Sequence, residues 1–330
     1  MSYAKARAIA VDDIPVIDVS ALHHTDKAGL NDRAGLTEVA KAMREAAEHT
    51  GFFYVRNHGI AAQLIARTDA IARRFFALPI EQKLRLVPNS HHRGFLQIGQ
   101  AKMHGKAKPD LKESFIWGLD VAADDVDVLA GNRMLGPNRW PDSIPEMRAT
   151  LNEYFDAANH CGRALLRAFA ASLQVDPDHF TRNFTKPVTR GSLVYYPAQP
   201  AEAGDKQFGV SPHTDYGVIT LLHQDDVGGL QVSNRRGEWV TAHPIADTLV
   251  INVGDLLARW TNDRFKSTPH RVINQSGRER LSIAVFVDPD FDTPIEPVVA
   301  SGETAHYEPT RCGDYILGRF DTSFAYRKAP

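Results

Sequence analysis

The chain has 330 residues, of which 43% are hydrophobic, and it carries a net charge of −2 with a pI of about 6.7. This length and composition allow a sizeable core, and the balanced charge argues against nucleic acid or an anionic membrane surface as a partner. The sequence contains neither a secretory signal segment nor an apolar run long enough to span a membrane, so it predicts a cytoplasmic protein.

The two cysteines and the paired histidines carry little chemical information. Cys161 and Cys312 form no CxxC pair, and two cysteines are too few for a disulfide framework in a chain of this length. We interpret both as buried, reduced thiols. The pair His91-His92 is predicted to lie exposed in a loop.

The N-terminal half is predicted to be mainly helical. Apolar residues at helical spacing predict helices over residues 36–50 and 61–77. Segments rich in aromatic and β-branched residues predict strands over residues 14–19, 51–60 and 113–117.

A long helix is predicted from Ser143 to about Val175, because Ser143 and Glu146 have the spacing of a capping box. After Pro187 the pattern changes, and many short apolar runs alternate with turns. Such a series favours an antiparallel sandwich or jelly roll. A last helix is expected from about Asp314. The short runs are SLVYYP, GVITLLHQ, GLQVSN, EWVTAHP, TLVINVGD, RVINQ and LSIAVFVDP.

These elements predict a protein of the α+β class with a mainly β core. Residues 1–187 are expected to form a helical region with flanking strands, packed as one unit with the rest of the chain. Residues 188–330 are expected to form a double-stranded β-helix, which is a distorted jelly roll, with a C-terminal helix.

A possible metal site begins at His213-Thr214-Asp215. If this triplet lies on or beside a strand, His213 and Asp215 point to the same side. His270, just before the strand-like run RVINQ, is the natural third ligand. Two imidazoles and one carboxylate on one face of an octahedron form the facial triad of non-haem iron(II) oxygenases, which leaves three positions open for a 2-oxoacid and O2.

An anion-binding pattern follows ten residues after His270. Arg280 and Ser282 alternate along a predicted strand and therefore share a face. A guanidinium can hold the distal carboxylate of 2-oxoglutarate through two charge-assisted hydrogen bonds, and a serine hydroxyl can add a third. Tyr196, on another predicted strand, could supply a further hydroxyl.

Taken together, these motifs resemble the isopenicillin N synthase-like family of 2-oxoglutarate/Fe(II) dioxygenases. Residues 213–286 are particularly similar to microbial members such as thymine 7-hydroxylase. The resemblance implies a jelly-roll core, iron bound by His213, Asp215 and His270, and 2-oxoglutarate bound by Arg280, Ser282 and Tyr196. The matching stretches are IPVID, GFFYVRNHGI, RGF, DLKESFIWG, GPNRWP, YYP, HTDYGVITLLHQDDVGGLQV, INVGDLLARWTND, STPHRV, RLSIAVF and CGDYILGRF.

The substrate contacts are predicted from alternation and from aromatic character. Phe286 shares the alternation of Arg280 and is expected to face the pocket, where similar enzymes pack this position on substrate. Arg93 could bind a substrate carboxylate or form a surface ion pair. The strand before the Tyr-Pro pair, read as residues 192–197, holds no arginine, whereas thymine hydroxylases carry one there. The other candidates are Tyr195, Tyr216, Trp117 and Phe95.

The favoured function is a dioxygenase that uses Fe(II), 2-oxoglutarate and O2 to hydroxylate a small metabolite, with release of succinate and CO2. One alternative is an iron oxidase that uses no 2-oxoacid and performs cyclisation or desaturation. A zinc hydrolase with the same three ligands is another, although no general-base carboxylate stands out by its spacing. A non-catalytic jelly-roll sensor is the alternative outside the enzymes. We expect a monomer or a small homo-oligomer.

Overall fold

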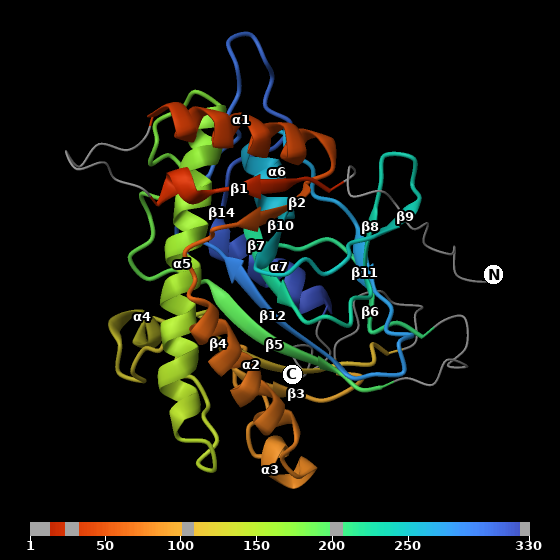
Figure 1. Cartoon of the computed structure of the whole chain (residues 1–330). Coiled ribbons are helices and arrows are strands. Elements are labelled where there is room, and N and C mark those ends of the chain that lie inside the picture. The colour runs from red at the N-terminus through yellow and green to blue at the C-terminus, as the bar shows by residue number, and fades with distance from the viewer. Residues whose placement is uncertain (1–13, 24–32, 101–108, 199–206, 324–330) are drawn as a thin grey trace.

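A computed structural model describes residues 14–23, 33–100, 109–198 and 207–323. Its larger sheet has eight strands in the spatial order β1-β2-β10-β7-β12-β5-β4-β3 (Figure 1). Strand β1 runs parallel to β2, and the other neighbours are antiparallel. The strands are β1 (Val16–Asp18), β2 (Phe52–Arg56), β3 (Gly94–Leu96), β4 (Glu113–Gly118), β5 (Arg190–Tyr196), β7 (Ile219–Gln224), β10 (Thr248–Val253) and β12 (Arg280–Val287).

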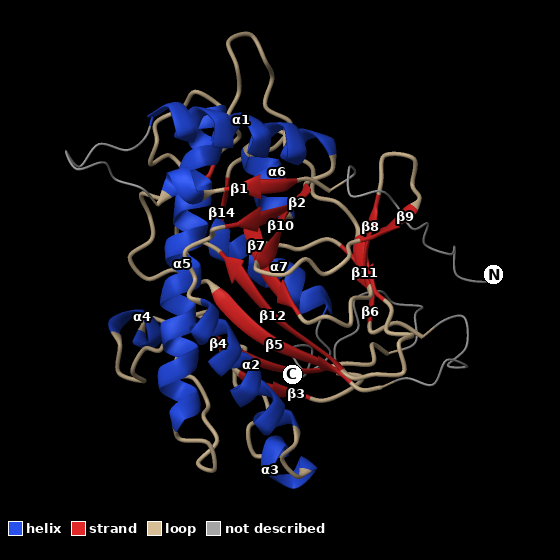
Figure 2. Cartoon of the chain, in the orientation of Figure 1, coloured by secondary structure: helices blue, strands red, loops and turns tan. Residues whose placement is uncertain are grey.

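A smaller antiparallel sheet has the order β6-β11-β8-β9, and Figure 2 shows it on the opposite side of the large sheet from helices α1, α2 and α5. Its first pairing places His213 directly opposite His270. A separate hairpin-like pair joins β13 to β14. These strands are β6 (Val210–His213), β8 (Leu230–Ser233), β9 (Trp239–Thr241), β11 (His270–Val272), β13 (Pro294–Ile295) and β14 (Thr310–Arg311).

Helices α1, α2 and α5 cover the face of the large sheet that points away from the small sheet (Figures 1 and 2). The longest of them, α5, buries apolar residues such as Leu151, Phe155 and Phe169 in the main core. The helices are α1 (Arg33–His49), α2 (Ala62–Phe76), α3 (Ile80–Leu84), α4 (Val126–Leu129), α5 (Glu146–Ser172), α6 (Asp255–Trp260) and α7 (Cys312–Ser323), with a 3-10 turn η2 (Ser20–Leu22).

The large sheet draws strands from both halves of the chain, since β2 pairs with β10 and β4 pairs with β5. The expected capping box is wrong. Pro145, not Ser143, occupies the N-cap of α5, and no side chain caps the helix there. The chain instead makes a turn in which the Ile144 N–H donates to Pro141, and this turn buries the Ile144 side chain.

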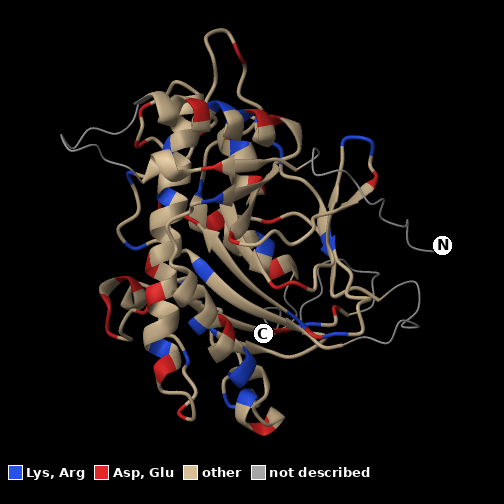
Figure 3. Cartoon of the chain, in the orientation of Figure 1, with Lys and Arg blue, Asp and Glu red and all other residues tan. Residues whose placement is uncertain are grey.

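A second, smaller apolar cluster fills the space between the two sheets. Its members include Val194 and Tyr196 from the large sheet and Val210, Leu230 and Val272 from the small one. The five residues named line one cavity together with the paired histidines. Acidic and basic residues are interspersed along the helices and loops (Figure 3). Within the described ranges, no helix is both long and apolar enough to cross a membrane.

Candidate active site

Three side chains converge at the mouth of the space between the sheets. Among the residues that the structure describes, His213, Asp215 and His270 form a cluster whose ligand atoms all lie within 4.8 Å of one another. The Nε2 atoms of His213 and His270 lie 3.6 and 3.7 Å from Oδ1 of Asp215. The β6–β11 pairing brings the two imidazoles together, with ring centroids 4.2 Å apart.

Backbone carbonyls fix the orientation of both imidazoles. Nδ1 of His213 lies 2.8 Å from the Ser211 carbonyl oxygen, and Nδ1 of His270 lies 3.2 Å from that of Thr268. A carbonyl oxygen only accepts, so each Nδ1 donates to its carbonyl and the Nε2 of each ring is the nitrogen that lies on the Asp215 side. Burial, reinforced by His270, lowers the pKa of His213 to about 3, which keeps this ring neutral at physiological pH.

The Asp215 carboxylate is held so that only one oxygen faces the histidines. Its Oδ2 accepts hydrogen bonds from the Thr220 hydroxyl at 2.6 Å and from the Asn252 amide at 2.8 Å. Burial alone would raise its pKa, but His270 and His213 outweigh burial and lower it, so the group is ionised. Two imidazole nitrogens and one carboxylate oxygen that converge in this way fit ferrous iron with open positions.

We expect Asn252→Ala to weaken Fe(II) binding by about 10- to 100-fold, the usual cost of losing a side chain that orients a metal ligand. The reason is that Asp215 would lose one of the two hydrogen bonds on Oδ2. Anaerobic competition with a chelator measures the affinity. Asn274→Ala is the matched control, because this buried amide donates to the Arg278 carbonyl, away from the metal ligands. Equal iron affinity in both variants would contradict the prediction.

A cavity of about 80 Å³ extends from the metal ligands to the predicted anchor for 2-oxoglutarate. Arg280, Ser282 and Tyr196 all line it. The Arg280 guanidinium is buried, donates through Nε to the Gly228 carbonyl at 2.6 Å, and lies 4.7 Å above the Tyr196 ring. The Ser282 hydroxyl lies 3.2 Å from Nη1 of Arg280. This buried, oriented guanidinium can hold a carboxylate at the far end of the cavity from the metal.

A second cavity, of about 110 Å³, also borders the candidate metal ligands His213 and Asp215. Strand alternation builds one wall, because Lys112, Ser114 and Ile116 share a face of the β4 segment while Arg190 and Ser192 share a face of β5. The remaining lining residues are His92, Leu96, His213, Thr214, Asp215, Tyr216, Phe286 and Phe320. His213, Asp215, Lys112 and Phe286 line both cavities.

Of the predicted substrate residues, Phe286 and Tyr216 lie in the wall of this second cavity. Tyr195 lies on the opposite face of β5, where its ring stacks on Phe76 and its hydroxyl donates to Glu279. Trp117 is buried in the core and donates to the Leu151 carbonyl. The expectation that Tyr195 and Trp117 face substrate is therefore corrected.

Strand β3 and the two residues before it also differ from expectation. Phe95 is buried in the main core against Phe75, and the Arg93 guanidinium donates to the carbonyls of Met134 and His91. Neither side chain lines the cavity, and their neighbours His92 and Leu96 do so instead. The expected exposure of His92 is also wrong, because it is buried with its ring 4.7 Å from that of Phe320.

Arg190 is a further candidate functional residue, because it lines this cavity and is not among the residues predicted from the sequence. Strand β5 begins at Arg190, two residues before the stretch taken as the strand, so the statement that it holds no arginine is wrong. The guanidinium lies 5.2 Å from the Phe286 ring and 4.5 Å from the Phe320 ring, and its Nη2 is 3.4 Å from Asp288. An arginine at the start of a strand that is otherwise mainly apolar is the sequence signal that could have identified it.

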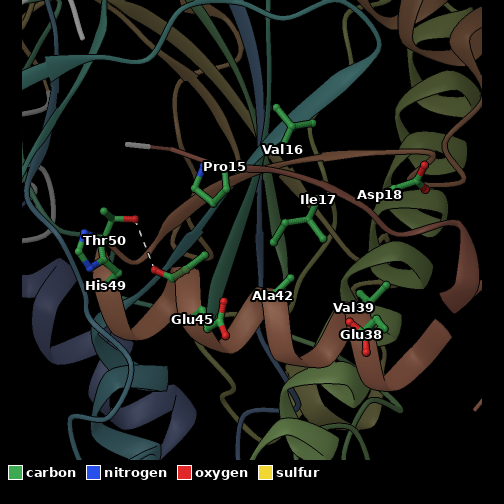
Figure 4. Close-up of a pocket in the computed structure, with 11 residues that line it drawn as sticks. Pro15, Val16, Ile17, Asp18, Glu38, Val39, Ala42, Glu45, His49 and Thr50 are labelled. Atoms are coloured by element: carbon green, nitrogen blue, oxygen red, sulfur yellow. Dashed lines mark hydrogen bonds between the residues drawn. The ribbon is translucent and has the colours of Figure 1, made fainter. Parts of the chain in front are cut away.

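A larger hollow lies elsewhere, between β1 and α1 (Figure 4). It has a volume of about 520 Å³ and shares no lining residue with the two cavities at the metal ligands. Apolar side chains such as Val16 and Val39 and the carboxylates of Glu38 and Glu45 form its walls. None of the residues lining it belongs to the convergent ligand cluster, so it is not a candidate for the metal.

Comparisons with known proteins agree with this geometry. The family model for the 2OG-Fe(II) oxygenase superfamily matches residues 191–289, and that for the N-terminal region of non-haem dioxygenases in morphine synthesis matches residues 14–143. A 2-oxoglutarate-Fe(II) type oxidoreductase of Emericella nidulans is 35% identical, over 95% of this chain and 92% of its own length. A homoarginine-6-hydroxylase of Glycine max is 33% identical, over 94% of this chain and 97% of its own length.

Solved structures show the same likeness. The full-length thymine 7-hydroxylase of Neurospora crassa in complex with alpha-KG, which is 2-oxoglutarate, superimposes with a TM-score of 0.83 and 32% identity, covering 96% of this chain and 99% of the other. The complex of the same protein with alpha-KG and thymine has a TM-score of 0.83 and 31% identity, with the same coverage.

Proposed function

The chain belongs to the 2OG-Fe(II) oxygenase superfamily, and we propose that His213, Asp215 and His270 hold its iron. Enzymes of this superfamily use Fe(II), 2-oxoglutarate and O2 to oxidise small molecules, and this chain is such an enzyme. The observation that carries the residue assignment is the convergence of two Nε2 lone pairs and one carboxylate oxygen. Bound iron supplies the activation of O2.

The cavity on the Arg280 side is our assignment for 2-oxoglutarate. Arg280 and Ser282 bind its distal carboxylate, and the Tyr196 ring supports the guanidinium from below. The Gly228 carbonyl accepts from Nε, and Nη1 lies 3.2 Å from the Ser282 hydroxyl, so these contacts hold the guanidinium in the cavity wall. Burial of this ion pair among Val194, Leu222 and Val272 strengthens it by excluding water.

The cavity on the Arg190 side is our assignment for the substrate, which we propose to be a small planar compound with a hydrogen-bond acceptor for Arg190. Phe286 and Phe320 hold the guanidinium by their ring faces, and Tyr216 adds another aromatic wall. A volume of about 110 Å³ suits a small ring rather than an extended chain. The structure of the Neurospora crassa enzyme with thymine, itself a planar ring, supports this class of substrate.

Anaerobic titration tests the assignment of both cosubstrates. Addition of Fe(II) and then 2-oxoglutarate should produce the weak visible band of the iron chelate, and admission of O2 with a substrate should release succinate in equal amount to the oxidised product. Ring compounds that present a carbonyl or carboxylate form the substrate panel. Failure of the band to appear with both additions would overturn the proposed function.

We expect Arg190→Gln to leave the 2-oxoglutarate band unchanged and to lower substrate-stimulated succinate release by about 10- to 100-fold, the cost of one hydrogen bond from a charged group. Arg163→Gln is the matched control, because this exposed arginine contacts the ring of Phe184 and lines neither cavity at the metal ligands.

The buried Asp288 complicates this test, because removal of Arg190 leaves its carboxylate without that cation. The double variant Arg190→Gln/Asp288→Asn removes both charges. It should unfold at a higher temperature than Arg190→Gln alone and still show the lowered succinate release. Recovery of full release in the double variant would show that Arg190 acts only on stability.

A further inference from the structure

Lys112 occupies an unusual position for a lysine in a site that binds a metal ion. It is half-buried immediately before β4 and lines both the 2-oxoglutarate cavity and the substrate cavity. Its ammonium makes no hydrogen bond or ion pair with any described residue. Glu113, the acidic residue next to it, is already paired with Lys83 at 2.7 Å. Within the described part of the chain, this ammonium is therefore available to an anionic ligand in the two cavities that it lines.

The 2-oxoglutarate cavity lacks one donor at the metal end. A 2-oxoacid that chelates a metal through its keto oxygen and one carboxylate oxygen leaves the second carboxylate oxygen to be satisfied by the protein. Thr220 and Asn252 already donate to Asp215, and Arg280 and Ser282 lie at the other end of the cavity. Of the described residues lining this cavity, Lys112 is the remaining cationic donor on the metal side.

We propose that the Lys112 ammonium binds the chelating carboxylate of 2-oxoglutarate, so that the cosubstrate is held by a cation at each end. This inference rests on the proposed function and adds a residue to it. Lys112 shares its cavity walls with His213, Asp215 and Phe286, the residues common to both cavities.

Two partial analogues separate the ends of the cosubstrate. 2-Oxobutyrate keeps the chelating oxoacid and lacks the distal carboxylate, whereas levulinate keeps the distal carboxylate and ketone and has a methyl group in place of the chelating carboxylate. Affinities are measured anaerobically with Fe(II), from the visible band for the oxoacids and by competition for levulinate. Lys112→Met should lower the affinity for 2-oxoglutarate and for 2-oxobutyrate by about tenfold each. It should leave the affinity for levulinate unchanged.

Arg280→Ala should also lower the affinity for 2-oxoglutarate, but the two analogues should exchange their responses. The affinity for levulinate should fall, and the affinity for 2-oxobutyrate should remain unchanged. Lys112→Arg keeps the charge and should bind 2-oxoglutarate within a few-fold of the wild-type enzyme, which excludes a loss caused by misfolding. Lys41→Met, at an exposed lysine on α1, is the matched control.

Several outcomes would overturn the inference. One is that Lys112→Met binds both oxoacids with the wild-type affinity. Another is that Lys112→Met binds Fe(II) more weakly in the absence of any oxoacid. Normal oxoacid binding with lost substrate-stimulated succinate release would assign Lys112 to an anionic substrate instead. Absence of the band in the wild-type enzyme would mean that the proposed function, rather than the role of Lys112, has failed.

Discussion

His213→Ala should abolish the visible band that 2-oxoglutarate forms with Fe(II), and with it succinate release. The physical reason is that the two remaining ligands, Asp215 and His270, cannot define a face of the coordination sphere. The vacated space would also admit water beside the Asp215 carboxylate. Anaerobic absorption spectra measured during a 2-oxoglutarate titration give the result directly, and a parallel assay under air measures succinate.

The control for this variant is His243→Ala. His243 is an exposed histidine in which only the backbone carbonyl has a described role, as the acceptor for the Tyr54 hydroxyl. Its replacement by alanine retains that carbonyl and should leave the band unchanged. Persistence of a full band in His213→Ala at wild-type Fe(II) affinity would remove His213 from the metal site.

The part of the site that could be predicted from sequence is the part that lies on regular strands. Along β12, polar Arg280 and Ser282 alternate with apolar residues, and the same alternation continues to Phe286, which the structure places on the same cavity wall. Residues two positions apart on a strand point to the same side of the sheet, so their shared face can be predicted without knowledge of the fold. The pairing of His213 with His270 lies beyond local spacing, because it depends on two strands that are distant in sequence.

The incorrect substrate residues share one physical cause. Trp117 was chosen because it is aromatic, although strand β4 buries its aromatic positions in the main core and turns Ser114 toward the cavity. Tyr195 and Tyr196 are adjacent on β5, so they could not both face the site. A polar side chain within an apolar strand, as at Ser114 and Ser192, is the better marker of the functional face.

Irregular backbone explains the remaining errors. His92 has a φ of 61°, a left-handed conformation that residues other than glycine seldom adopt. This turn directs its ring toward Phe320 and sends Arg93 to the carbonyl of Met134. No periodic pattern in a sequence indicates such a reversal, so the sequence predicts Arg93 in the cavity wall where the structure places His92.

Arg280→Ala should weaken 2-oxoglutarate binding by about 2–4 kcal/mol, the cost of truncating one partner of a buried charge pair, which corresponds to roughly 30- to 1,000-fold. The guanidinium is buried, so the loss is not screened by solvent as it would be at the surface. The affinity is read from the same anaerobic band, with 2-oxoglutarate raised until the band saturates. Iron affinity should remain at the wild-type value, because Arg280 lies at the end of the cavity away from the metal ligands.

Two further variants define what the arginine supplies. Arg280→Lys retains the charge but not the paired donors, and it should recover only part of the lost affinity. Arg278→Ala is the matched control two residues earlier on the same segment, where the side chain forms an exposed ion pair with Asp226 and should contribute nothing to binding. Equal 2-oxoglutarate affinities in Arg280→Ala and Arg278→Ala would show that the cosubstrate does not use this end of the cavity, and the anchor would then have to lie on the Arg190 side of the metal ligands.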